Sequence, residues 1–224
     1  RTKKQIYIMY VGPDIVTDGL VLSLDAGSER SYPGTGTTWY DLSPTNADWT
    51  LPTGVYSAGT MNYTSDRSSL TPPTAWQSTT DLTIETWYKP ITGGTNTGCC
   101  DTIFGRYDFR FFQIGGSIYT MIGFTNASGG RTYQHPSFSV SYDNWHHIVG
   151  MRRDNRFIIW IDGVERYNTN FASGLNLYDV GGTWVISSVP HSNVDITSNR
   201  IYNRGLSDSE IIQNFNAQKN RFGL

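Results

Sequence analysis

The chain has 224 residues, of which 17 are basic and 19 acidic, so its formal net charge is −2. Charged residues make up 16% and aromatic residues 14%, which excludes a disordered chain and a basic surface for nucleic acid or an anionic membrane. No run approaches the ~18 consecutive apolar residues of a membrane span, and 23 glycines beside nine prolines indicate a turn-rich β protein.

The first 16 residues precede the first clear strand. They contain a continuous apolar, β-prone run that includes Ile6, Tyr7, Ile8, Tyr10 and Val11. The run is short for a signal peptide, and no small-residue cleavage pattern follows it. An exposed segment of this type favours strand pairing with another chain. We therefore expect residues 1–16 to be an arm that binds a neighbouring subunit or, alternatively, an extra strand on the protein's own sheet. Residues 17–224 form the domain.

Short apolar or alternating runs follow, separated by Gly, Asn, Asp, Ser and Pro. The clearest alternation puts Leu82, Ile84 and Tyr88 on one face of a strand and Glu85 and Trp87 on the other. Strands at this spacing, with turn signals between them, predict an antiparallel sandwich or jelly roll. The expected strands are Val21–Leu24, Leu82–Lys89, Phe109–Ile114, Ser117–Phe124, Trp145–Met151, Phe157–Ile161 and Trp184–Val189.

Two tight turns are predicted around the strand at Phe157–Ile161. Asp154-Asn155 has the composition of a hairpin turn, and Asp162-Gly163 allows Val164–Tyr167 to fold back on this strand. The strand is apolar on both faces, which predicts cover on both sides. One cover is the facing sheet, and we expect a long loop or a neighbouring subunit to supply the other.

One helix is predicted near the C-terminus. Ser207 and Glu210 have the spacing of a capping box, and the apolar Ile211, Ile212 and Phe215 then lie on one stripe. The helix should run to about Gln218.

The only two cysteines, Cys99 and Cys100, are adjacent. Adjacent cysteines cannot join distant segments. The fold is therefore not built on disulfides, which fits assembly in a reducing cytoplasm.

Several segments resemble laminin G-like domains of phage and marine-virus structural proteins. The likeness spans residues 17–224 and implies a concanavalin A-like jelly roll: an all-β, two-sheet antiparallel sandwich with one short C-terminal helix. The same fold carries lectins, glycosidases and scaffolds. The segments are Gly19–Gly27, Ser31–Ser43 (SYPGTGTTWYDLS), Leu82–Pro90 (LTIETWYKP), Trp145–Val149, Ile158–Val164, Asn199–Glu210 (NRIYNRGLSDSE) and Lys219–Leu224.

A hydrolytic role is not expected. Glycoside hydrolysis uses two carboxyl groups at a fixed separation, and the E-x-D-x-x-E strand of the jelly-roll glucanases is absent here. Of the four glutamates only Glu85 lies within an expected strand. His146 and His147 are adjacent, so a regular strand would point them to opposite faces. The chain is therefore predicted not to be an enzyme.

No cofactor is expected. Calcium is the candidate metal, at the aspartates that match the family's motif positions. The corresponding residues are Asp25, Asp66 and Asp195, since calcium prefers carboxylate and carbonyl oxygens. The segment Met61–Arg67 nevertheless lacks the first Asp and the Gly of the family's F-D-G-x-x-D-Y stretch. That departure weakens the prediction of a calcium site.

A carbohydrate site would need an aromatic platform and a few planar polar groups. The chain offers Tyr107, Tyr133 and Trp184 in expected loops or at strand ends. These three residues are the predicted sugar-binding residues.

The resemblance implies a non-enzymatic virion structural protein that decorates the capsid or belongs to the neck, tail or fibre. It would assemble in the host cytoplasm with other virion subunits or as a homo-oligomer. The alternative is an adhesion module that binds carbohydrate on the host surface. Neither interpretation includes binding to nucleic acid or to a membrane.

Overall fold

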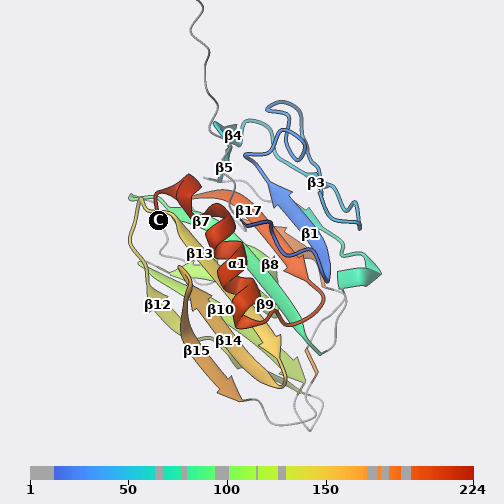
Figure 1. The fold of residues 1–224 in the computed structure, drawn as a ribbon, viewed down its shortest axis with the longest axis vertical. Coiled ribbons are helices and arrows are strands. Elements are labelled where there is room, and N and C mark those ends of the chain that lie inside the picture. The colour runs from blue at the N-terminus through green and yellow to red at the C-terminus, as the bar shows by residue number, and fades with distance from the viewer. Residues whose placement is uncertain are drawn as a thin grey trace, which may run out of the picture.

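A computed structural model describes residues 13–63, 68–76, 80–93, 101–114, 116–125, 130–170, 176–177, 182–187 and 193–224. Two antiparallel sheets form a sandwich, and one helix, α1 (Asp208–Gln218), lies across the outer face of the first sheet (Figure 1). This arrangement confirms the predicted all-β jelly roll with one short C-terminal helix. In the part of the chain described, no helix is long and apolar enough to span a membrane.

The first sheet has the strand order β15-β14-β13-β7-β17-β5-β4, and β1 also pairs with β17. Its long central pair, β7 and β17, runs antiparallel with a bulge between Ile196 and Ser198. The strands are β1 (Leu20–Asp25), β4 (Tyr56–Ser57), β5 (Thr60–Tyr63), β7 (Leu82–Pro90), β13 (His146–Arg153), β14 (Arg156–Ile161), β15 (Val164–Asn170) and β17 (Val194–Tyr202).

The second sheet has the order β11-β10-β9-β8-β16-β6, and β12 also pairs with β10. Its strands are β6 (Ser68–Leu70), β8 (Asp101–Arg106), β9 (Phe109–Ile114), β10 (Ser117–Thr125), β11 (Arg131–Gln134), β12 (Ser137–Ser139) and β16 (Trp184–Ile186). A separate pair, β2 (Thr38–Trp39) and β3 (Trp49–Thr50), and two short 3-10 turns, η1 (Thr74–Trp76) and η2 (Lys219–Phe222), complete the fold.

The alternation in β7 is confirmed. Leu82, Ile84 and Tyr88 belong to the core between the sheets. Glu85 and Trp87 are also fully buried, but they face the C-terminal segment, because Trp87 stacks on Phe215 with ring centroids 5.9 Å apart. Both faces of β7 are therefore buried: one packs in the core between the sheets, and the C-terminal segment covers the other.

The second cover of β14 is the protein's own helix. Ile158 and Trp160 pack with Leu206 and Ile211 in a cluster separate from the main core. The expectation of a long loop or a neighbouring subunit at this face is therefore wrong. An amphipathic helix supplies the missing apolar surface within the same chain.

Local signals for turns and caps are confirmed. Asp154 and Asn155 have φ values of 51° and 59°, and Asp162 has φ 52°, as tight hairpin turns require. Gly163 combines φ 76° with a close approach, because a Cβ there would lie 2.8 Å from the Phe215 ring. Helix α1 begins at the reciprocal capping box of Ser207 and Glu210.

The segment 13–16, which the sequence assigned to the arm, is attached to the domain. The backbone N–H of Val16 donates to Asn214 Oδ1 at 2.9 Å, and the Tyr202 hydroxyl donates to the Val16 carbonyl at 3.1 Å. Gln213 Nε2 donates to the Asp14 carbonyl at 2.7 Å. These residues help to fasten α1 to the first sheet. The expected arm residues Ile6, Tyr7, Ile8, Tyr10 and Val11 lie outside the described residues.

Candidate functional site

Glu85 lies at the centre of a buried polar network under α1. Its side chain is 0% exposed, its Oε1 accepts from Arg200 Nη1 at 2.5 Å, and its Oε2 accepts from Asn214 Nδ2 at 2.8 Å. His147 Nε2 lies 3.2 Å from Oε1. Burial alone would raise the pKa of Glu85, but the charge of Arg200 and the hydrogen bonds of His147 and Asn214 lower it to about 2.

This network is built for structure and not for proton transfer. A carboxylate with a pKa of about 2 stays ionised at neutral pH, and Glu85 has no solvent-exposed surface that a substrate could reach. His146 points away from it, as its Nδ1 lies 2.8 Å from Asp162 Oδ2. The adjacent histidines therefore serve two separate sites, as expected for neighbouring strand residues.

The His146–Asp162 pair makes stability depend on pH. Burial alone would lower the pKa of His146, but the hydrogen bond and charge of Asp162 outweigh it and raise the pKa above the ordinary value of 6.5. A raised pKa in the folded state contributes stability below pH ~6.5, and this contribution is lost as the pH rises through the folded pKa. We expect the unfolding free energy, measured by urea titration, to fall above pH ~6.5.

Asp162→Asn tests this linkage, since asparagine also tolerates the positive φ and keeps the acceptor for the His147 N–H. The variant should show a flatter pH profile than the wild-type protein in this range. An unchanged slope would show that His146 is not the group responsible.

The predicted calcium ligands are not brought together by any contact in the structure. Asp25 pairs with Arg221 at 2.7 Å and accepts from Gln218 at 3.2 Å. Asp195 pairs with Lys89 at 2.7 Å and accepts from Asn62 at 2.6 Å, while Asp66 lies outside the described residues. Within the described ranges, no group of three or more His, Cys, Asp or Glu side chains could hold a metal ion. Asp25 and Asp195 each already have a cationic partner.

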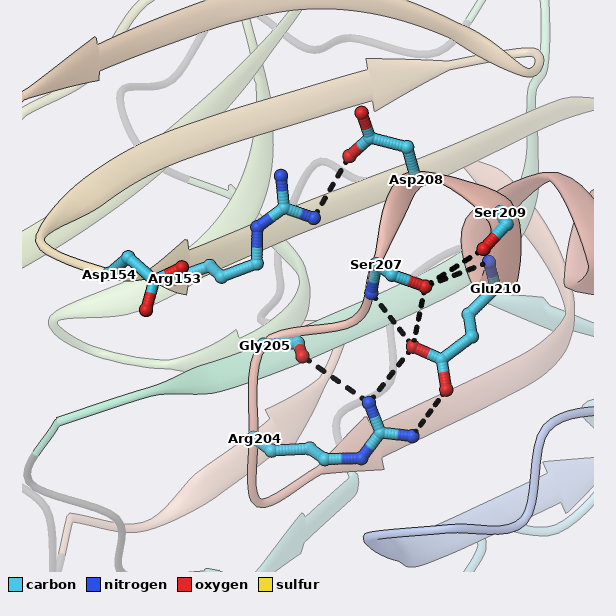
Figure 2. A pocket seen from close by; sticks show the side chains of 8 residues that line it. All are labelled: Arg153, Asp154, Arg204, Gly205, Ser207, Asp208, Ser209 and Glu210. Atoms are coloured by element: carbon cyan, nitrogen blue, oxygen red, sulfur yellow. Dashed lines mark hydrogen bonds and ion pairs between the residues drawn. The ribbon is translucent and has the colours of Figure 1, made fainter.

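A surface hollow of about 580 Å³ lies at the N-terminal end of α1. Figure 2 shows the side chains that line it. Four of its five charged side chains pair with one another: Arg153 pairs with Asp208 at 2.9 Å, and Arg204 pairs with Glu210 at 2.6 Å. The same Glu210 closes the capping box. The polar groups of this hollow are thus used to start the helix and to hold the loop before it.

A tyrosine–arginine cluster, defined as Tyr107, Arg110, Arg131 and Tyr133, lies on the second sheet. The Arg131 guanidinium carbon is 5.6 Å from the Tyr107 ring centroid, and Arg131 Nη1 donates to the Tyr133 hydroxyl at 3.2 Å. The Arg110 guanidinium carbon is 5.1 Å from the Tyr107 ring centroid. Two arginines thus lie within cation–π distance of one tyrosine ring.

The pairing of strands explains why these residues meet. Tyr107 lies in the turn between β8 and β9, and Tyr133 of β11 is opposite Gly123 of β10. A Cβ at Gly123 would lie 2.9 Å from both Asp108 Cβ and Tyr133 Cε1. Glycine at position 123 therefore allows the close approach of both residues.

The electrostatics of the cluster favour an anion. Asp108 is buried, and its Oδ1 lies 3.9 Å from Arg131 Nη1. The two positive charges of Arg110 and Arg131 thus exceed the single negative charge of Asp108. Burial raises the pKa of Tyr133 and lowers the pKa of Arg110. The Arg131 side chain remains 42% exposed and Tyr107 56% exposed. The exposed ring can stack on a ligand, and the exposed guanidinium beside it can donate two hydrogen bonds to a carboxylate.

Two of the three predicted sugar-binding residues, Tyr107 and Tyr133, therefore lie together. The prediction that Trp184 offers a surface platform is wrong, because Trp184 is 0% exposed and packs edge-on against Trp76 at 5.6 Å within the core. The sequence interpretation missed both arginines. The alternation of β9 could have identified Arg110, because Phe109 and Phe111 on either side of it face the core.

The comparisons with known proteins agree with this fold. A family profile described as "Concanavalin A-like lectin/glucanases superfamily", of the laminin G type, matches residues 62–212. The match covers more than half of the chain, so the chain belongs to this family. No curated protein matches the chain in sequence.

Solved structures with the same fold include toxin binding domains. The binding domain of botulinum neurotoxin serotype D has a TM-score of 0.70 at 13% identity, with 91% of this chain and 52% of that chain covered. The binding domain of Paraclostridial Mosquitocidal Protein 1 has a TM-score of 0.70 at 18% identity, with 90% of this chain and 53% of that chain covered. The serotype D domain in complex with N-acetylneuraminic acid has a TM-score of 0.71 at 15% identity, with 91% of this chain and 52% of that chain covered. The chain spans about half the length of these proteins, and the likeness is one of fold.

Proposed function

We propose that the chain is a non-enzymatic carbohydrate-binding domain and that its tyrosine–arginine cluster holds an acidic saccharide. The observation that carries the proposal is the exposed Tyr107 ring, 5.6 Å from the guanidinium of the half-exposed Arg131. The apolar face of a sugar ring stacks on an aromatic side chain, and the guanidinium fork matches the geometry of a carboxylate.

The proposed absence of catalysis is supported by the state of the strand carboxylate. Glu85 is buried, paired with Arg200 and ionised at neutral pH. The other glutamates in the described part of the chain lie apart from it: Glu29 and Glu165 are exposed, and Glu210 caps α1. The buried Glu85 is therefore not accessible to a substrate as the acid or the nucleophile of a glycosidase.

The choice of an acidic saccharide is supported by the charge of the cluster and by one structure of similar fold. N-acetylneuraminic acid, the ligand named for that botulinum neurotoxin domain, is a sugar that carries a carboxylate. It is therefore a suitable first probe. Binding by this chain does not follow from the shared fold and needs its own test.

Tyr107→Ala should abolish the binding of acidic glycans on a glycan array, because it removes the stacking platform. Tyr40→Ala is the matched control, since Tyr40 is 44% exposed and lies outside the cluster. We expect the control variant to bind as the wild-type protein does. Equal binding by both variants would contradict the assignment of this cluster.

We also propose that the domain acts as part of a virion, with other virion subunits or copies of itself as partners. Support comes from the sequence resemblance, above all Asn199–Glu210 and Lys219–Leu224. Deletion of residues 1–12 should leave the melting temperature nearly unchanged and prevent assembly, as measured by light scattering. Unfolding of the truncated monomer would show instead that this segment completes the protein's own sheet.

A further inference from the structure

A second hollow, of about 380 Å³, lies beside the β4–β5 hairpin and remote in sequence from the tyrosine–arginine cluster. Two tyrosines, Tyr32 and Tyr56, line it together with residues of two glycine-containing loops. The remaining lining residues are Gly34, Thr35, Gly36, Thr37, Thr53 and Gly54. Most of them belong to the segment SYPGTGTTWYDLS, to which the proposed function assigns no role.

The aromatic wall of this hollow is held in place. The Tyr32 hydroxyl donates to the Gly36 carbonyl at 2.8 Å, which ties the ring to its own loop. The Tyr32 and Tyr56 rings lie 4.6 Å apart at an angle of 46°. Tyr32 is nearly buried, whereas Tyr56 is only partly buried and packs on the core. Tyr56 is thus the ring that a ligand in the hollow can reach.

The rest of the wall is polar and uncharged. Thr35, Thr37 and Thr53 are exposed and bring hydroxyl groups that both donate and accept. Gly36 and Gly54 have φ values of 92° and 81°, and a Cβ on either would meet no atom within 4 Å. Both glycines therefore leave open space and accessible backbone at the hollow. None of the lining residues is acidic, basic or histidine.

We infer that this hollow is a binding site for a neutral saccharide of one or two rings. Its volume lies within the range of small-molecule sites, ~300–1,000 Å³. A reachable tyrosine ring suits the C–H face of a sugar, and hydroxyl and backbone groups suit its hydroxyls. The absence of charged lining residues disfavours the anionic ligand proposed for the tyrosine–arginine cluster. The inference extends the proposed function to a second site with a different specificity.

The test is calorimetric titration of the full chain with three neutral disaccharides, namely cellobiose, maltose and lactose. Thr53→Trp should block the hollow from an exposed position, and Tyr56→Ala should remove the platform. We expect at least one disaccharide to bind the wild-type protein and to bind each variant at least about tenfold more weakly. Melting temperatures verify that Tyr56→Ala is folded, and Thr53→Trp provides an independent test that leaves the tyrosine pair intact.

Two controls separate this site from the tyrosine–arginine cluster. Tyr107→Ala and Arg131→Gln each disable the cluster and leave every residue that lines the hollow in place. Both should bind the neutral disaccharide as the wild-type protein does. The inference is overturned if the wild-type protein binds none of the three at about 10 mM, or if binding survives both Thr53→Trp and Tyr56→Ala. Loss of binding in Arg131→Gln would instead assign the sugar to the cluster.

Discussion

Glu85→Ala is expected to lower the free energy of unfolding by about 3–5 kcal/mol. The substitution leaves the Arg200 guanidinium, whose side chain is 2% exposed, without its carboxylate partner. It also removes the acceptor of Asn214, the residue that joins α1 to Tyr202 and Val16. One substitution therefore weakens both the sheet interior and the attachment of the helix.

Urea unfolding measures the effect of Glu85→Ala. Glu165→Ala is the matched control, because Glu165 is exposed on β15 and accepts a hydrogen bond from Asn168 Nδ2 at 3.0 Å. We expect the control to change the unfolding free energy by less than about 0.5 kcal/mol. Similar stabilities for the two variants would contradict the described burial of the network.

Trp76→Ala is expected to cost about 3–5 kcal/mol of stability, through lost packing and the cavity that remains. Trp76 is 0% exposed, stacks on Trp49 with ring centroids 6.4 Å apart and meets Trp184 edge-on. Its Nε1 also donates to the Val21 carbonyl at 2.6 Å. This side chain therefore joins β1 of the first sheet to β16 of the second.

Thermal and urea unfolding test this prediction with two companion variants. Trp76→Phe keeps most of the ring volume but loses the hydrogen bond to Val21, so it should cost about 1–3 kcal/mol. Trp145→Ala should cost less than Trp76→Ala, since Trp145 is only partly buried, against Phe222. A Trp76→Ala protein as stable as Trp145→Ala would show that Trp76 does not join the sheets.

Local patterns predicted the long elements well. The period-two alternation of Leu82–Lys89, the turn residues Asp154-Asn155 and the capping box of Ser207 each depend on neighbours in sequence, and the structure confirms all three. The strands β2, β3 and β4 have two residues each, too few to show any periodicity. They depend on tertiary contacts that sequence patterns do not reveal.

The candidate site was harder to predict because its parts come from different strands. Tyr107 and Arg131 are separated by 24 positions and meet only through the pairing of β9, β10 and β11. Trp184 shows the opposite error: a tryptophan at the start of a predicted strand looked accessible, but β16 lies between β8 and β6 and points it into the core. Whether a single aromatic residue is buried therefore depends on the order of the strands in the sheet, which a local sequence pattern does not reveal.

The guanidinium of Arg131 gives the proposed function its most specific consequence. Arg131→Lys keeps the positive charge but loses the planar fork, so it should bind an acidic saccharide more weakly than the wild-type protein. Arg131→Gln loses both. Arg156→Gln is the matched control, because Arg156 is exposed on β14 of the other sheet and donates to Asn168.

The most direct test is calorimetric titration of these proteins with N-acetylneuraminic acid and with its uncharged methyl ester. We expect saturable binding of the acid by the wild-type protein and by Arg156→Gln, with affinity reduced about tenfold or more by Arg131→Gln. The methyl ester should bind more weakly than the acid. No binding of the acid at about 10 mM, or equal binding by wild type and Arg131→Gln, would show that the tyrosine–arginine cluster does not hold an acidic saccharide.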